Sequence, residues 1–132
     1  MRLHGVTLLV HDYDEAIAHY VDDLGFSLVE DTDMGSGRRW VRVAPDPDGG
    51  TSLILAVATT EAQRAAIGNQ TGGRVFLILK TDDFDRDLAR FKQAGIEFLE
   101  EPRTEAYGKV VVFRDAFGNK WDLIEPLAKQ AL

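Results

Sequence analysis

Hydrophobic and polar residues follow a strand pattern and then a helical pattern, and this succession occurs twice along the chain. Residues 3–10 and 75–80 have the pattern of buried or half-buried strands. Each is followed by a helical pattern with apolar residues three and four positions apart: Ile17, Tyr20, Val21 and Leu24 in the first half, and Phe84, Leu88 and Phe91 in the second. Each half is therefore predicted to begin with a strand and a helix.

A match between the two halves indicates an internal duplication. At a shift of 71 residues, 12–14 (Asp-Tyr-Asp) matches 83–85 (Asp-Phe-Asp), and Gly37 matches Gly108. With a one-residue slip, Gly25 matches Gly95, and 29–31 matches 99–101. The common order and spacing of these matches favour two copies of one module.

Three short strands are expected after each helix, which gives a β-α-β-β-β module. They are predicted at 26–31, 38–44 and 51–57 in the first copy, and at 96–100, 109–114 and 119–125 in the second. The predicted division is a first module at 1–57, a linker at 58–73 with a short helix near 61–67, a second module at 74–126 and a tail at 127–132. One helix covers one face of each four-stranded sheet, so this α+β arrangement leaves two open faces, which are expected to form a shared ligand cleft.

Composition limits the partners of the chain. The 132 residues include 45% hydrophobic and 28% charged residues, no cysteine, and a formal net charge of −7. We expect a soluble, cytoplasmic protein that has neither a membrane span nor nucleic acid as a partner, because phosphate would repel an acidic surface. The absence of cysteine excludes disulfides and thiolate chemistry.

Several separated motifs resemble the vicinal oxygen chelate superfamily, which includes glyoxalase I, bleomycin-resistance proteins and extradiol dioxygenases. They are Gly25-Phe26 after the first helix, the Gly-x-Arg-Trp-Val segment at 37–41, the Glu-Pro-x-x-x-x-Tyr-Gly segment at 101–108, and 113–123, which is similar to an F-x-D-P-D-G-N-x-x-E-L ending. The resemblance implies tandem βαβββ modules in a cup-shaped half-barrel, a small-molecule ligand and a homodimer.

The resemblance also implies four metal-ligand positions, one on the first and last strand of each module. Here they fall on Gly5, on Leu55 with a register uncertainty of one, on Phe76 and on Asp122. Only Asp122 is able to bind a metal, so no metal cofactor is expected. The alternative is a divalent ion such as Zn, Ni, Mn or Fe, with a ligand supplied from an unexpected position such as His4.

Alternation along the strands adds candidate ligand-binding residues. Trp40 and Arg42 are expected on the open face, because Val41 and Val43 suit the helix-covered side. The full candidate set is Thr7, Trp40, Arg42, Leu55, Phe76, Ile78, Lys80, Tyr107, Phe113 and Asp122, with Phe113 placed as the repeat match of Arg42.

Three functions remain open from the sequence. The first is a metal-free binder of a small organic molecule. The second is a metal-dependent enzyme of the glyoxalase, lyase or dioxygenase type. The third is a metal-free enzyme in which Asp122 is the catalytic acid or base and Arg42 or Lys80 stabilises an oxyanion.

Overall fold

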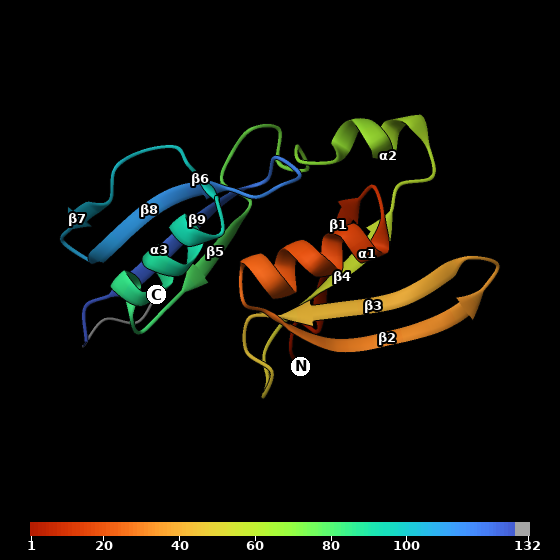
Figure 1. Cartoon of the computed structure of the whole chain (residues 1–132), viewed down its shortest axis with the longest axis horizontal. Helices are drawn as coiled ribbons and strands as arrows, with labels where there is room; N and C mark the ends of the chain where they lie inside the picture. The colour runs from red at the N-terminus through yellow and green to blue at the C-terminus, as the bar shows by residue number, and fades with distance from the viewer. Residues whose placement is uncertain (129–132) are drawn as a thin grey trace. The chain divides into compact units, whose positions relative to one another are not determined.

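The computed structural model describes residues 1–128 and divides the chain into two compact units. Unit 1 is Met1–Ile67 and unit 2 is Gly68–Leu132. The last four residues of the predicted tail, 129–132, lie outside the described part. Each unit has one mixed sheet and a helix on one of its faces (Figure 1). The α+β class predicted from the sequence is confirmed.

Unit 1 has the predicted element order, in the sheet order β1-β4-β3-β2. Its strands are β1 (Gly5–Val10), β2 (Ser27–Gly35), β3 (Arg38–Ala44) and β4 (Ser52–Val57), and its helices are α1 (Tyr13–Ile17), η1 (Ala18–Asp23) and α2 (Glu61–Ala66). Strands β1 and β4 are parallel and the other pairs are antiparallel. Strand β2 continues four residues beyond the predicted 26–31, forming a long hairpin with β3.

The first helix begins after a side-chain cap at Asp12 and changes its winding before it ends. The carboxylate of Asp12 accepts a hydrogen bond from the backbone N–H of Glu15 at 2.8 Å. From Ala18 the helix continues as the π-helix η1, which the 3.6-residue pattern did not predict. Gly25, with φ of 80°, follows the helix as the pattern predicts.

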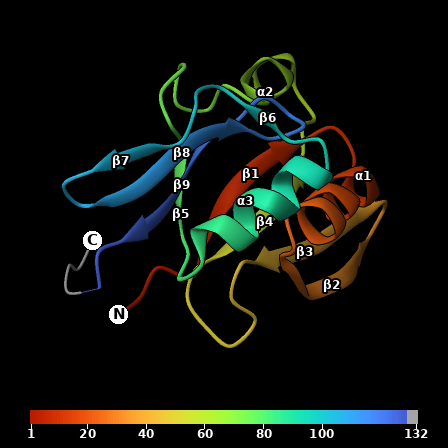
Figure 2. The same cartoon turned by 60° about the vertical axis from the view of Figure 1, so that its left-hand side comes forward.

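The core of unit 1 lies between this helix and the sheet (Figure 2). Strands β3 and β4 contribute Val41, Val43 and Leu55, which are at most 1% exposed. The ring of Tyr20 stacks on Phe26 with centroids 5.9 Å apart. These side chains occupy alternate strand positions, so the opposite face of the sheet remains without a helix.

Unit 2 repeats the plan with one additional strand. Its elements are β5 (Leu77–Lys80), α3 (Phe84–Gln93), β6 (Glu97–Phe98), β7 (Arg103–Glu105), β8 (Gly108–Arg114) and β9 (Lys120–Pro126). The sheet order is β5-β9-β8-β6, and β7 also pairs with β8. The strand predicted at 96–100 is shorter than expected, because pairing with β8 stops after Phe98 and resumes at Arg103.

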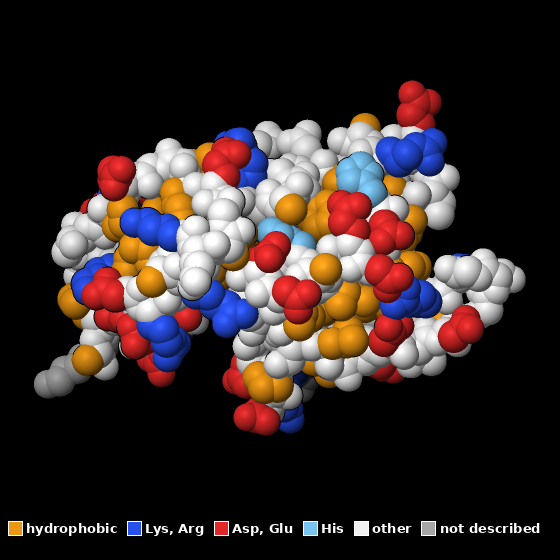
Figure 3. Space-filling view, in the orientation of Figure 1, with side chains coloured by type: hydrophobic (Ala, Val, Ile, Leu, Met, Phe, Trp, Pro, Cys, Tyr) orange, Lys and Arg blue, Asp and Glu red, His pale blue; other side chains and the backbone are white. Residues whose placement is uncertain are grey.

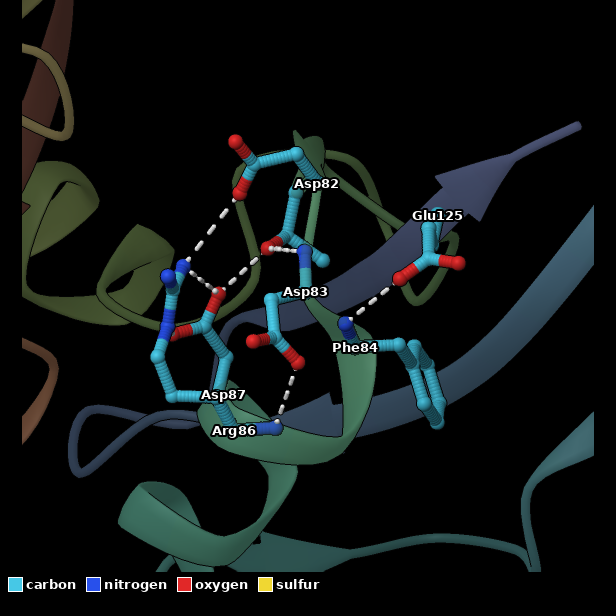
Figure 4. Close-up of polar contacts among 7 residues, drawn as sticks. Asp82, Asp83, Phe84, Arg86, Asp87 and Glu125 are labelled. Atoms are coloured by element: carbon cyan, nitrogen blue, oxygen red, sulfur yellow. Dashed lines mark hydrogen bonds and ion pairs between the residues drawn. The ribbon is translucent and has the colours of Figure 1, made fainter. Parts of the chain in front are cut away.

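Helix α3 starts with the same cap as α1, 71 residues later. The carboxylate of Asp83 accepts from the N–H of Arg86 at 3.1 Å. Glu125 of β9 accepts from the N–H of Phe84 at 2.8 Å, and the guanidinium of Arg86 pairs with Asp87 (Figure 4). These contacts satisfy the first N–H groups of the helix and fasten it to its sheet.

The core of unit 2 is aromatic and corrects one sequence prediction. Phe113 is fully buried, stacks on Trp121 at 5.9 Å, and contacts Phe91 at 5.1 Å. It therefore belongs to the helix-covered face and not to the open face, where the repeat match placed it. None of the described helices is long and apolar enough to cross a bilayer.

Candidate functional site

The open face of unit 1 carries a pocket of about 890 Å³. Cross-strand register defines this open face: Thr7 lies opposite Ile54, Leu9 lies opposite Ala56, and Arg42 lies opposite Ile54 from the other side. The pocket is lined on this face by Thr7, Leu9, Trp40, Ile54 and Ala56. Its floor is therefore mostly apolar, as in pockets that hold organic ligands.

A hydrogen-bonded chain fixes the side chains beside this floor. Glu30 of β2 accepts from the indole Nε1–H of Trp40 and from Nη1 of Arg42, both at 3.1 Å. Nε of Arg42 donates to the hydroxyl of Ser52 at 3.1 Å, and that hydroxyl donates to the carbonyl of His4 at 3.3 Å. The indole is held by its N–H while the residue remains 37% exposed. One carboxylate thus orients an aromatic ring and neutralises a cation.

A second ion-pair group stiffens the β2–β3 hairpin near the pocket. Arg39 donates to Asp31 at 2.7 and 3.1 Å, donates to Asp14 at 2.9 Å, and lies over the ring of Tyr13 at 5.1 Å. These hydrogen bonds hold the pKa of the Asp31 carboxyl below its usual value. Arg38, which also lines the pocket, is exposed.

The open face of unit 2 presents a different polar group. Asp122 of β9 lies opposite Ile78 of β5 on one side and Val112 of β8 on the other. Within residues 1–128 its carboxylate forms no hydrogen bond or ion pair. Burial raises the pKa of Asp122, the nearby Arg103 lowers it, and Glu100 raises it. The carboxyl group is therefore half-buried between apolar neighbours, without a partner in the described part of the chain.

The guanidinium of Arg103, which lowers the pKa of Asp122, is hydrogen-bonded to other carboxylates. Nε of Arg103 donates to both carboxylate oxygens of Glu100 at 2.9 Å, and Nη1 donates to Glu105 at 2.7 Å. Glu100 additionally accepts from the N–H of Val112 at 3.1 Å. Arg103 is thus bound to two carboxylates, and Asp122 is not part of this hydrogen-bonded group.

The structure places the predicted residues on both faces of the sheets. Thr7, Trp40 and Arg42 lie on the open face of unit 1, and Ile78, Lys80 and Asp122 on that of unit 2. Phe76 is half-buried just before β5, and Tyr107 is 37% exposed in the turn between β7 and β8.

Two of the predicted residues are one position away from the open face. Leu55 is 1% exposed and level with Leu8 and Val41 on the covered face, so Ile54, which lies within the one-residue uncertainty of the prediction, takes the open-face place. Leu55 still lines the pocket beside Ile54. Val112 takes the place predicted for Phe113. In a strand a shift of one residue moves the side chain to the other face, which accounts for both corrections.

Sequence reasoning also missed the residues that fix the polar groups, namely Glu30, Glu100 and Arg103. One feature of the sequence pointed to the two glutamates. Glu30 and Glu100 match at the one-residue slip, a shift of 70, and the same slip matches Arg42 to Val112.

The residues present do not fit the metal that the family resemblance implies. A side chain at Gly5 would have its Cβ 2.6 Å from Cδ1 of Ile54, so an isoleucine fills the space in front of this strand. Asp122 has only Ile78 and Val112 as direct neighbours across its strand. In the described part of the chain, no three His, Asp or Glu side chains gather in a way that suits a metal ion. His4 is exposed.

The tandem βαβββ architecture and the one-helix, open-face sheets define a class of proteins. A family model of the Glyoxalase/Bleomycin resistance protein/Dioxygenase superfamily matches residues 2–123, and the chain belongs to this superfamily. Its relatives include an uncharacterized protein of Shewanella frigidimarina (strain NCIMB 400), 49% identical over 96% of this chain and 95% of that protein. Another is the uncharacterized protein YurT of Bacillus subtilis (strain 168), 29% identical over 95% and 99%.

Solved structures agree with this assignment. UcmS2 superposes with a TM-score of 0.80 and 30% identity, covering 94% of this chain and 97% of that one. TnmS3, an antibiotic binding protein from Streptomyces sp. CB03234, superposes with a TM-score of 0.76 and 30% identity, covering 96% of each chain. The shared cleft, the homodimer and the cytoplasmic location stay predictions.

Proposed function

We propose that this protein binds a small organic molecule with a planar aromatic part on the open face of unit 1, without the metal of its superfamily. The observation that carries the proposal is the pocket of about 890 Å³, with Trp40 beside an apolar floor. Ligand pockets have volumes of roughly 300–1,000 Å³ and are mostly apolar, with few polar groups. The hydrogen bond from Trp40 to Glu30 leaves the π face of the indole available for stacking.

The similarity to TnmS3 supports binding as the activity of this fold. That protein is described as antibiotic binding, and it is 30% identical to this chain over nearly its whole length. The hydrogen-bonded chain from Trp40 to Ser52 preorganises the wall of the pocket, which lowers the entropy lost on binding.

A thermal-shift screen with planar aromatic compounds tests this proposal. A compound that binds the folded state raises the melting temperature by linkage, by an amount that grows with its concentration. We expect naphthalene- and quinoline-sized compounds to raise the melting temperature of the wild type and to lose this effect in Trp40→Ala. Leu28→Ala, which removes another exposed hydrophobic side chain of unit 1, is the control and should retain the effect. A response that is unchanged in Trp40→Ala would place the ligand elsewhere.

The environment of Asp122 favours a second candidate function, that of a metal-free enzyme with Asp122 as acid or base. Burial raises the pKa of Asp122 above its ordinary value, which is the direction that favours a carboxyl group as a general acid or base. Arg42 is committed to Glu30 and Ser52, so Lys80 is the better candidate for stabilising an oxyanion. Conversion of a bound compound with a pH–rate profile that disappears in Asp122→Asn, while binding persists, would support this function. Binding without conversion supports the first.

A further inference from the structure

The open face of unit 2 contains an ionisable group that its surroundings do not satisfy. Buried or half-buried carboxylates in proteins are normally hydrogen-bonded or paired, because removal from water costs free energy. Asp122 departs from this rule. Its cross-strand neighbours, Ile78 and Val112, are apolar, and its carboxylate has no partner among the described residues. The half-buried carboxylate is still accessible, so a ligand with a cationic or donor group can pair with it.

The cations of unit 2 that share this face are engaged or lie further along the strands. Arg114 pairs with Glu97 at 2.8 Å, and Nζ of Lys120 donates to the carbonyl of Gly73 at 3.0 Å. Arg103 is bound by two carboxylates, as described above. Lys80 lies opposite Ile124, one pair beyond Asp122, and is exposed. The charged groups around Asp122 are therefore Arg103 and Glu100 from the β6–β7 segment, Arg114 from β8, Lys120 from β9 and Lys80 from β5.

The apolar surface beside the carboxylate is accessible. Ile78 is 67% exposed, an unusual degree for an isoleucine in a strand, and Val112 is half-buried. A ligand that places a methylene or aromatic body on Ile78 would bury this surface. The same ligand would present a polar end to Asp122.

We infer that Asp122, Ile78 and Val112 form a binding site for an organic cation, whose ammonium N–H groups donate to the carboxylate while its apolar body covers Ile78. An ammonium group suits the position because it supplies both the missing charge and the missing donors. This site belongs to unit 2 alone, and its test requires no ligand in the pocket of unit 1.

Benzylamine and its neutral isostere benzyl alcohol are suitable probes. Both are titrated into ¹⁵N-labelled protein at pH 7, and the amide resonances of Ile78, Val112 and Asp122 are followed by NMR. We expect benzylamine to bind at these amides roughly fivefold more tightly than benzyl alcohol, the scale of a partly exposed ion pair. Asp122→Asn should reduce this preference to about one.

Matched variants separate a local site from a general effect of charge. Glu97→Gln removes the same unit of negative charge from the same unit, at a carboxylate that is already paired with Arg114, and should retain the preference for the amine. A dispersed spectrum of each variant establishes that it is folded. Equal binding of amine and alcohol in the wild type, equal loss in Glu97→Gln, or shifts confined to other amides would each overturn the inference. None of these results bears on the Trp40 pocket, whose failure would appear in the thermal-shift screen instead.

Discussion

The two units share a scaffold but differ in how their open faces treat charge. In unit 1 the central cross-strand pair is Arg42 opposite Ile54, and the cation is neutralised by Glu30. In unit 2 the equivalent pair is Val112 opposite Asp122, and the charged residue has no partner among residues 1–128. The charged member of the pair is a cation on β3 in unit 1 and an anion on β9 in unit 2.

The glutamate that satisfies unit 1 has a counterpart that is used differently. Glu30 binds Trp40 and Arg42 across the β2–β3 hairpin. Glu100, its match in unit 2, faces a valine on β8 and instead binds Arg103. One face is consequently preorganised by its own hydrogen bonds, while the other retains an unsatisfied acceptor. The two units share a scaffold, and a few open-face positions give one a paired cation and the other an unpaired carboxylate among the described residues.

The largest loss of stability is expected at Phe113, which the repeat match placed on the open face and which the structure places on the covered face. Phe113→Ala should lower the free energy of unfolding by about 3–5 kcal/mol, because it removes a fully buried ring that contacts Phe91 and Trp121. Val112→Ala, one position away, should cost about 1 kcal/mol. Urea denaturation measures both values. Similar costs for the two variants would contradict the assignment of Phe113 to the covered face.

A smaller effect is expected from making unit 1 resemble unit 2. Glu30→Gln leaves Arg42 without its anion and weakens the hydrogen bond to Trp40, so we expect a loss of about 1 kcal/mol in unfolding free energy. Ligand-induced stabilisation should weaken as well, because the indole is less firmly held. Glu61→Gln, at an exposed position in α2, is the matched control. The account is contradicted if both variants behave alike.

The reverse substitution should make unit 2 resemble unit 1. Val112→Arg places a guanidinium opposite Asp122, which should bring the pKa of Asp122 from its raised value to or below the ordinary aspartate range. Carboxyl ¹³C chemical shifts measured against pH report this change directly. Val6→Arg, a half-buried valine of unit 1, should leave the pKa of Asp122 in place.

The smallest effect is expected in how the free energy of unfolding depends on pH, through the ionisation of Asp122. The pKa of Asp122 is higher in the folded than in the unfolded chain, so the folded state holds this proton more tightly and loses stability as pH rises through that pKa. Asp122→Asn carries no such proton. At pH 7 it should be more stable than the wild type by roughly 0.5 kcal/mol, a small value because solvent screens the half-exposed group. The difference should vanish below the ordinary pKa of aspartate, and a variant less stable than the wild type at pH 7 would contradict the unpaired state of Asp122.

The sequence predicted the elements well because their signals are local. The caps at Asp12 and Asp83 recur at the 71-residue shift, and both helices end before glycines with positive φ. The open-face prediction failed at β3 and β8, where Arg42 corresponds to Val112, a shift of 70, although Gly37 and Gly108 just before these strands match at 71. Because strand side chains alternate, that single residue exchanged Phe113 for Val112.

Partners of the polar residues were beyond the sequence for a related reason. The contact of Glu30 with Trp40 and Arg42 depends on the register of β2 against β3, which contains two irregularities between Leu28 and Gly35. The break between β6 and β7, which releases Glu100 toward Arg103, likewise has no period to predict it. Long-range pairings of this kind follow from packing and not from local pattern.

The indole N–H resonances of the two tryptophans test the central claim most directly, since one lies on each kind of face. Trp40 lines the pocket of unit 1, whereas Trp121 is 2% exposed and donates to Asp115 at 2.9 Å in the core of unit 2. The measurement titrates the compound that raises the melting temperature most into ¹⁵N-labelled protein. The account predicts that the Trp40 indole signal moves in proportion to occupancy while the Trp121 signal stays in place. A saturated complex in which the Trp40 signal does not move would contradict it.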